Sequence, residues 1–303
     1  MARHNFFERL ERELDIQFEY EKIENIVLNE HAGYCTLNDE IEENFNEWKF
    51  KKNYVSFEEL RNYMGFTYSK SRNGVKEANA EIKDMDDFIL YCEMIYNMIF
   101  CVLGDLARYD FSELTEKVLR IIDYDIEKIN HDIIYFEEKE QYLIVQKDPA
   151  ASAVADIVMP DLADSIIEYN HHLLKGNLKE KQLILKMIAD ALEPKRKELR
   201  AVNKTIESDF FYMVNCMNIR HNNCDANDLK KYNPEFAILT DEQKEMWYDE
   251  IYQEGLMAFL MLEQTKRDKK ILDFKNSGNC QGSCQVRAEK SEDFHLLEIE
   301  HLQ

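Results

Sequence analysis

The fold class follows from the stretch Thr240–Phe274, which reads TDEQKEMWYDEIYQEGLMAFLMLEQTKRDKKILDF. It opens with Thr240 and Gln243 at the spacing of a capping box, in which two side chains bind the free N–H groups of a helix start. Apolar residues then recur at steps of three and four, the period of an amphipathic α-helix. That apolar stripe includes Met246, Trp247, Ile251, Leu256, Phe259, Leu260 and Leu262. The stretch therefore predicts one long helix over residues 241–274.

The same period recurs through most of the chain. We expect further helices over residues 6–27, 41–50, 57–64, 86–108, 112–130, 149–172 with a break at Pro160, 178–192 and 195–220. Only 8 glycines and 4 prolines occur in 303 residues, too few for the turns of a sandwich, propeller or large barrel. One exception is IIYFEEKEQYLIVQ, Ile133–Gln146, in which two β-rich runs flank a polar turn and indicate a β-hairpin; a helix that continues to Glu140 is the alternative. The predicted fold is an all-α multi-helix bundle with at most one small β-hairpin.

Composition shifts divide the chain into three expected parts. Residues 1–83 form an N-terminal helical region that ends after the loop SKSRNGV, Ser69–Val75. Residues 84–276 form a helical bundle, and residues 277–303 form a polar, flexible tail.

Charge and missing motifs exclude several classes of function. The net charge is −22, which repels polyanions and argues against general nucleic-acid coating. The sequence contains no GxGxxG, GxxxxGK or GxSxG pattern, so no dinucleotide fold, P-loop or nucleophile elbow is expected. The start lacks an apolar signal segment, and the run Phe88–Gly104 carries Glu93 and Asn97, which favours a buried helix over a membrane span. We therefore expect a cytoplasmic protein without a membrane segment.

Positive charge gathers in one region of this acidic chain. Asn177–Lys231 contains 11 basic and 8 acidic residues. A local basic face can bind RNA or another anion. The alternative is a solvated helix face held by ion pairs four residues apart.

That region ends in the polar cluster Asn218–Asn223, whose candidate site residues are Arg220, His221, Asn222 and Asn223. Arginine clamps phosphate, and histidine exchanges protons near neutral pH. Cleavage of RNA needs both a proton acceptor and a cation beside the phosphorane. The alternative is structural, since cations stabilise helix C-termini and asparagine adopts left-handed capping positions.

The cluster resembles the motif region of HEPN domains, small helical bundles that include RNA-cutting toxins and phage-defence proteins. Their motif is an arginine, a polar residue, and a histidine four to six residues after the arginine. Arg220 matches the arginine and His221 the polar residue, whereas Asp225, Ala226 and Asn227 stand where the second histidine belongs. The likeness spans about residues 111–276 at the level of helix order.

This resemblance implies a metal-independent endoribonuclease of phage-defence or toxin type that needs no cofactor and dimerises around its site. Arg220 would then clamp the scissile phosphate and His221 would act as acid and base. Asn222 and Asn223 would orient the phosphate or water. The alternative hypothesis is a non-catalytic acidic helical interaction or scaffold protein with a protein partner.

Metal-type spacings are present but do not predict a metal site. Glu-x-x-His occurs at Glu168/His171, Glu292/His295 and Glu298/His301, close to the number expected by chance in so acidic a chain. The tail spacing of Cys280, Cys284, His295 and His301 is that of an irregular zinc finger, and incidental residues in a mobile tail are the alternative that we favour. His171 and His172 are expected about 100° apart on a helix, a packing arrangement rather than a ligand pair.

Overall fold

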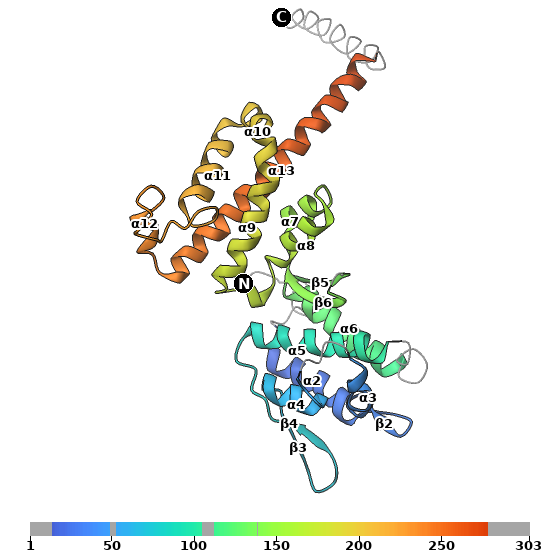
Figure 1. The fold of residues 1–303 in the computed structure, drawn as a ribbon. Coiled ribbons are helices and arrows are strands. Elements are labelled where there is room, and N and C mark those ends of the chain that lie inside the picture. The colour runs from blue at the N-terminus through green and yellow to red at the C-terminus, as the bar shows by residue number, and fades with distance from the viewer. Residues whose placement is uncertain (1–13, 49–52, 105–111, 138, 278–303) are drawn as a thin grey trace, which may run out of the picture. The chain divides into compact units, whose positions relative to one another are not determined.

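The computed structural model describes residues 14–48, 53–104, 112–137 and 139–277. The chain divides into two compact units. Unit 1 comprises the described residues of Met1–Pro149 and Asp164–Asn177, and unit 2 those of Ala150–Ala163 and Leu178–Gln303. Figure 1 shows the elements of both units.

Unit 1 is built of helices with three short antiparallel hairpins among its described residues. Its helices are α2 (Ile16–Asn29), α3 (Leu37–Asn44), η1 (Phe45–Glu47), α4 (Phe57–Met64), α5 (Met85–Asn97), η2 (Met98–Leu103), α6 (Ser112–Lys128) and η4 (His172–Leu174). The hairpins pair β1 (His31–Ala32) with β2 (Cys35–Thr36), β3 (Tyr68–Lys70) with β4 (Lys76–Ala78), and β5 (His131–Phe136) with β6 (Gln141–Gln146). α7 (Pro149–Ala155) and α8 (Pro160–Glu168) lie where the chain passes between the units.

The core of unit 1 forms around α2 and α5, whose apolar stripes are fully buried against each other and against α6. A charged group lies inside this core. Arg61 Nη2 donates to Glu24, and Tyr91 Oη donates to the other oxygen of Glu24 at 2.7 Å. The Arg61 guanidinium lies over the rings of Phe57 and Tyr68, at 5.5 and 5.2 Å from their centroids. Because Glu24 and Arg61 are both inaccessible to solvent, each charge depends on the other for compensation.

Unit 2 gathers shorter helices around one long helix. Its main elements are α9 (Leu178–Leu192), η5 (Glu193–Lys195), α10 (Arg196–Val202), α11 (Lys204–Cys216), α12 (Pro234–Ala237) and α13 (Asp241–Asn276). α13 packs against α9, α10 and α11. Gly255 allows this close approach, because a Cβ atom there would lie 2.8 Å from Cγ2 of Ile188 and 3.2 Å from the Phe210 ring.

The predicted all-α class is confirmed, since helices hold 66% and strands 9% of the described residues. The expected hairpin at Ile133–Gln146 is confirmed as β5–β6, but the limit of one hairpin is wrong. The two further hairpins turn around Gly33 and Gly74, both with positive φ. Their strands have two and three residues, too short for apolar alternation to reveal them.

Several helix bounds differ from expectation. The helix expected to reach His172 ends at Glu168, because the chain leaves it to pair with β6: Gln146 N–H donates to the Asn170 carbonyl at 3.0 Å. The helix expected over 195–220 is divided at Asn203, whose Oδ1 caps the start of α11. The boundary expected near residue 83 lies within unit 1. The expected tail, apart from Ser277, lies outside the described residues.

Within the part of the chain that the structure describes, no helix combines the length and the apolar character needed to cross a membrane.

Candidate functional site

Arg220 lies after α11 and turns back onto the C-terminal end of α9. Its Nη1 donates to Glu193 Oε2 at 2.5 Å, and its Nη2 donates to the Ala189 carbonyl at 3.1 Å. Asp190 Oδ1 lies 3.5 Å from the same Nη2. The Arg220 side chain is only 17% exposed, and its guanidinium carbon lies 5.5 Å from the centre of the Phe211 ring. Arg220 therefore connects the loop after α11 to α9 through acceptors of both the backbone and side chains.

Asn223 stabilises the same loop through hydrogen bonds to its backbone. Its Oδ1 accepts from the Asn218 N–H at 2.8 Å, and Asn218 Oδ1 accepts from the Asn223 N–H at 3.0 Å. Asn223 Nδ2 also donates to the Lys231 carbonyl at 2.5 Å. The left-handed residue here is Asn218, with φ of 62°. Asn223 is buried, and it serves as the reciprocal partner of that turn.

His221 is half-buried and Asn222 is exposed, next to Arg220. Among the described residues, none hydrogen-bonds the His221 ring. The four candidate residues are thus close in space, with Arg220 and Asn223 in structural contacts and His221 and Asn222 nearer the surface.

Four of the 11 basic residues in Asn177–Lys231 pair with acidic side chains: Lys181, Arg196, Arg200 and Arg220. Arg196 and Arg200 donate to the buried Glu207 carboxylate at 2.5 and 2.7 Å, and these hydrogen bonds hold the pKa of Glu207 below its usual range. Lys181 pairs with Glu245 and Asp249 of α13 at 2.8 and 2.7 Å. These contacts join α10 to α11 and α9 to α13.

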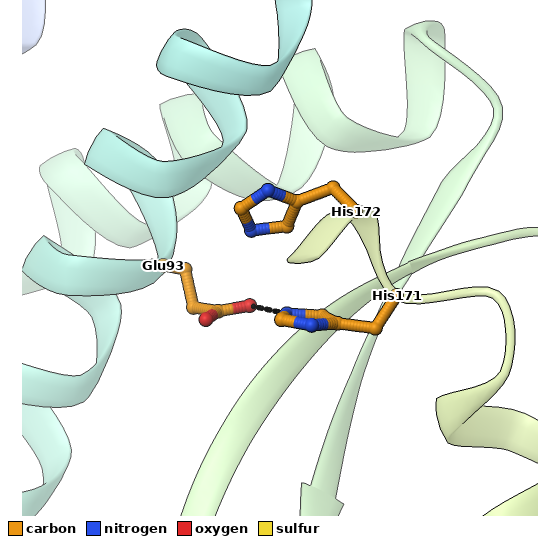
Figure 2. Close-up of side chains that lie close together, drawn as sticks. All are labelled: Glu93, His171 and His172. Carbon is orange, nitrogen blue, oxygen red and sulfur yellow. Dashed lines mark hydrogen bonds and ion pairs between the residues drawn. The ribbon is translucent and has the colours of Figure 1, made fainter. Parts of the chain in front are cut away.

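A different cluster lies in unit 1, where the side chains of Glu93, His171 and His172 converge (Figure 2). Glu93 projects from α5, whereas His171 and His172 lie at the extended segment that precedes and opens η4. One ligand-type atom of each residue lies within 4.8 Å of the other two. His171 Nε2 donates to Glu93 Oε2 at 2.9 Å, and the same oxygen accepts from the Ile144 N–H of β6 at 2.7 Å.

Burial sets the electrostatics of this cluster. His171 is 6% exposed and Glu93 is 9% exposed. The pKa of His172 is lowered to about 4, mainly by burial and also by the neighbouring His171, against the opposing charges of Glu93 and Asp86. The rings of His171 and His172 lie 4.5 Å apart between centroids. His172 Nε2 is shielded from solvent, and no group in the described residues hydrogen-bonds it.

Two imidazoles and a carboxylate form a set that can hold a transition metal. Zinc enzymes with this ligand set leave a fourth position for water, and iron enzymes use the same three groups on one face. Beside the cluster, Glu93 also lines a cavity of about 170 Å³ together with Asn97, Cys101 and Gln141 of unit 1. The rest of its lining is mainly apolar: Trp48, Leu60, Met64, Leu90, Met94 and Met98.

Sequence reasoning missed this cluster. Glu93 and His171 are 78 residues apart, and no spacing motif connects them. The pair suggested by spacing, Glu168 and His171, does not form the site, because Glu168 pairs with Lys139 instead. The expected helical geometry of His171 and His172 is wrong as well, since His171 has extended backbone with ψ of 137°. The sequence signal that could have indicated this cluster is the adjacent pair His171-His172. The Cys and His spacings of residues 280–301 lie outside the described residues.

The chain matches no protein-family model, no curated protein and no solved structure.

Proposed function

We propose that the chain is a non-catalytic helical interaction protein, with a HEPN-like multi-helix bundle in unit 2. The observation that carries this proposal is the engagement of Arg220 by Glu193, Asp190 and the Ala189 carbonyl. A phosphate-clamping arginine needs donors free for the phosphate oxygens. Here Nη1 and Nη2 support the packing of the loop after α11 on α9, and Nε is buried without a hydrogen-bond partner among the described residues.

The electrostatics around Arg220 support the same proposal. Two carboxylates lie within 3.5 Å of its guanidinium, and their negative charge repels an incoming phosphate. Stabilising a phosphorane would require Arg220 to exchange these contacts for the substrate. Arg196 and Arg200 are engaged by Glu207 in the same way.

The surface of the chain suits a protein partner. The net charge of −22 favours a partner with a basic surface, because opposite charges accelerate encounter and select among partners. Ile271, Leu272 and Phe274 of α13 are each at least half exposed, and apolar side chains gathered on one helix end favour association. We propose that the acidic surface binds a basic protein partner and that the apolar end of α13 forms a homodimer, with the protein acting in the cytoplasm.

The second candidate is a HEPN-like endoribonuclease of phage-defence or toxin type that acts on RNA without a metal. The specific observation in its favour is the His221 ring, which lies next to Arg220 and has no hydrogen-bond partner among the described residues. Such a histidine is available to accept and return a proton. RNA would then lie along the basic region Asn177–Lys231.

The experiment compares cleavage of mixed cellular RNA by the wild type, Arg220→Ala and His221→Ala, each purified as the full chain in the presence of a chelator. The interaction protein should leave RNA intact in all three samples, and light scattering should show a dimer. Arg220→Ala should lower the free energy of unfolding of unit 2 by about 1–3 kcal/mol, because it leaves the carbonyl of the buried Ala189 and the Glu193 carboxylate without their donor. His221→Ala should leave it unchanged.

Cleavage by the wild type that His221→Ala reduces about 10²–10⁴-fold would establish the ribonuclease instead, since that is the usual contribution of general acid–base catalysis. His221→Ala is the decisive variant because the half-buried His221 ring makes no hydrogen bond to the described residues. Lys230→Ala, in the same basic region, is the matched control for any loss of general affinity for RNA.

A further inference from the structure

We propose that Glu93, His171 and His172 of unit 1 form a binding site for one first-row divalent metal ion, with Zn²⁺ as the ion that fits the ligand set best. The inference is independent of the function proposed for unit 2. It rests on the geometry, burial and hydrogen-bond contacts of three side chains.

The first argument is distance. Zinc binds histidine nitrogen at about 2.0–2.1 Å and carboxylate oxygen at about 2.0–2.2 Å, so two ligand atoms of a tetrahedral ion lie roughly 3.3 Å apart. The three ligand-type atoms already lie within 4.8 Å of one another, and His171 Nε2 and Glu93 Oε2 are 2.9 Å apart. To reach zinc distances, the ligand atoms that lie furthest apart must approach each other by at most about 1.5 Å, a shift that side-chain rotation can supply.

The second argument is the state of His172. Its Nε2 is excluded from water and lacks a hydrogen-bond partner in the described part of the chain. A buried ring nitrogen without a partner is costly, so a native fold seldom retains one without a ligand. The figure places that ring directly beside the Glu93 carboxylate and the His171 ring (Figure 2).

The third argument is that the carboxylate is already oriented. The Ile144 N–H of β6 donates to Glu93 Oε2 at 2.7 Å, which fixes the carboxylate toward the two rings. Hydrogen bonds of this kind orient metal ligands and tune their affinity. When the ion binds, His171 presents the lone pair of Nε2 and carries its ring proton on Nδ1, so the ion replaces the hydrogen bond between Nε2 and Glu93.

Binding has a structural consequence within unit 1. The ion would connect α5 to the segment Asp164–Asn177. At present the hydrogen bond between Glu93 and His171, which are 78 residues apart, connects them. Since the site is absent in the unfolded chain, the free energy of binding adds to the stability of unit 1.

The test uses the full chain with Cys280→Ser and Cys284→Ser, so that the tail thiolates cannot contribute ligands. The protein is stripped with a chelator and titrated with Zn²⁺ alone, and stoichiometry is read by calorimetry and elemental analysis. We expect one Zn²⁺ per chain and a rise in the melting temperature. Titration with Co²⁺ should give visible bands of a nitrogen- and oxygen-ligated ion with no thiolate charge transfer.

Three variants decide the assignment. His172→Ala and Glu93→Gln should each weaken binding by at least about 100-fold, more than the loss of a supporting hydrogen bond usually causes. Glu168→Gln is the matched control, because it precedes His171 by three residues but pairs with Lys139, and it should bind as the parent does. Glu93→Gln keeps the acceptor for Ile144, so it tests the site even if His172→Ala folds poorly. Absence of stoichiometric Zn²⁺ in the parent, equal binding by His172→Ala and Glu93→Gln, or equal loss in Glu168→Gln would overturn the proposal.

Discussion

Replacing Glu24 by alanine should destabilise unit 1 severely. Glu24 accepts hydrogen bonds from Arg61 and Tyr91, and the side chains of Glu24 and Arg61 are both buried from solvent. Removing the carboxylate leaves the Arg61 guanidinium buried without a counter-charge, which typically costs about 3–5 kcal/mol. Tyr91→Phe removes one hydrogen bond to the same carboxylate, and it should cost about 1.5–3 kcal/mol.

The assay is urea unfolding followed by tryptophan fluorescence. The chain has two tryptophans, Trp48 in unit 1 and Trp247 in unit 2, so a Trp247→Phe background reports on unit 1 alone. Trp48 lies 5.7 Å from the Phe45 ring between centroids, against the core that Glu24 and Arg61 share. At a slope of about 2 kcal/mol per molar urea, Glu24→Ala should lower the midpoint by about 1.5–2.5 M.

The double variant Glu24→Leu with Arg61→Met tests the reasoning directly. Replacing a buried ion pair by apolar side chains of similar volume is often neutral or stabilising, so the double variant should recover most of the loss. The physical account fails if Glu24→Ala costs less than about 1 kcal/mol, or if the double variant is as unstable as the sum of the single ones.

Two further perturbations test other parts of the fold. Gly255→Ala should lower the stability of unit 2 by about 1–3 kcal/mol in thermal unfolding, because its Cβ would lie 2.8 Å from Ile188; a gain in stability would contradict the packing described here. Burial, reinforced by the charge of Glu19, raises the pKa of Asp125 to about 7, so the folded state holds a proton that the unfolded chain releases near pH 4. The stability from this group is therefore complete below about pH 4 and is lost as the pH rises through 7, by about 1–2 kcal/mol once screening by solvent is included. Asp125→Asn should flatten that loss in urea titrations at pH 4 to 8, and an unchanged profile would refute the shift.

Local chemistry carried most of the fold prediction. The Thr240–Gln243 capping box fixes the start of α13, and α9 spans the predicted residues 178–192. Both elements are long enough for an apolar period to be visible, and Thr240 binds free N–H groups at the start of α13. The hairpin β5–β6 was predictable for a related reason, since its strands have six residues each.

The errors lie where tertiary contacts outweigh local preference. Asn203 divides the helix expected over 195–220 because its side chain accepts from both Thr205 and Ile206 N–H groups, an alternative to continuing the helix. His171 leaves a helical pattern because its backbone pairs with Val145 of β6, a partner that no local window contains. The same long-range pairing brings His171 to Glu93, so the error in the helix bound and the missed cluster share one physical cause.

Residue type alone did not identify which polar groups are available for chemistry. The sequence predicts a phosphate clamp at Arg220 because arginine binds phosphate, yet Nη1 and Nη2 contact Glu193 and the Ala189 carbonyl, and only Nε is left without a hydrogen-bond partner among the described residues. The sequence predicts packing for His172 because a helix would place it about 100° from His171, yet its Nε2 is buried without a hydrogen-bond partner in the described residues. A polar atom already bound within the fold must break a contact before it can bind a ligand, whereas a buried atom without one gains a contact. The unpartnered Nε2 of His172 therefore favours ligand binding at the cluster in unit 1, whereas the bound Nη atoms of Arg220 favour a structural role in unit 2. Zn²⁺ binding by His172→Ala tests the first point, and the integrity of RNA incubated with the wild type tests the second.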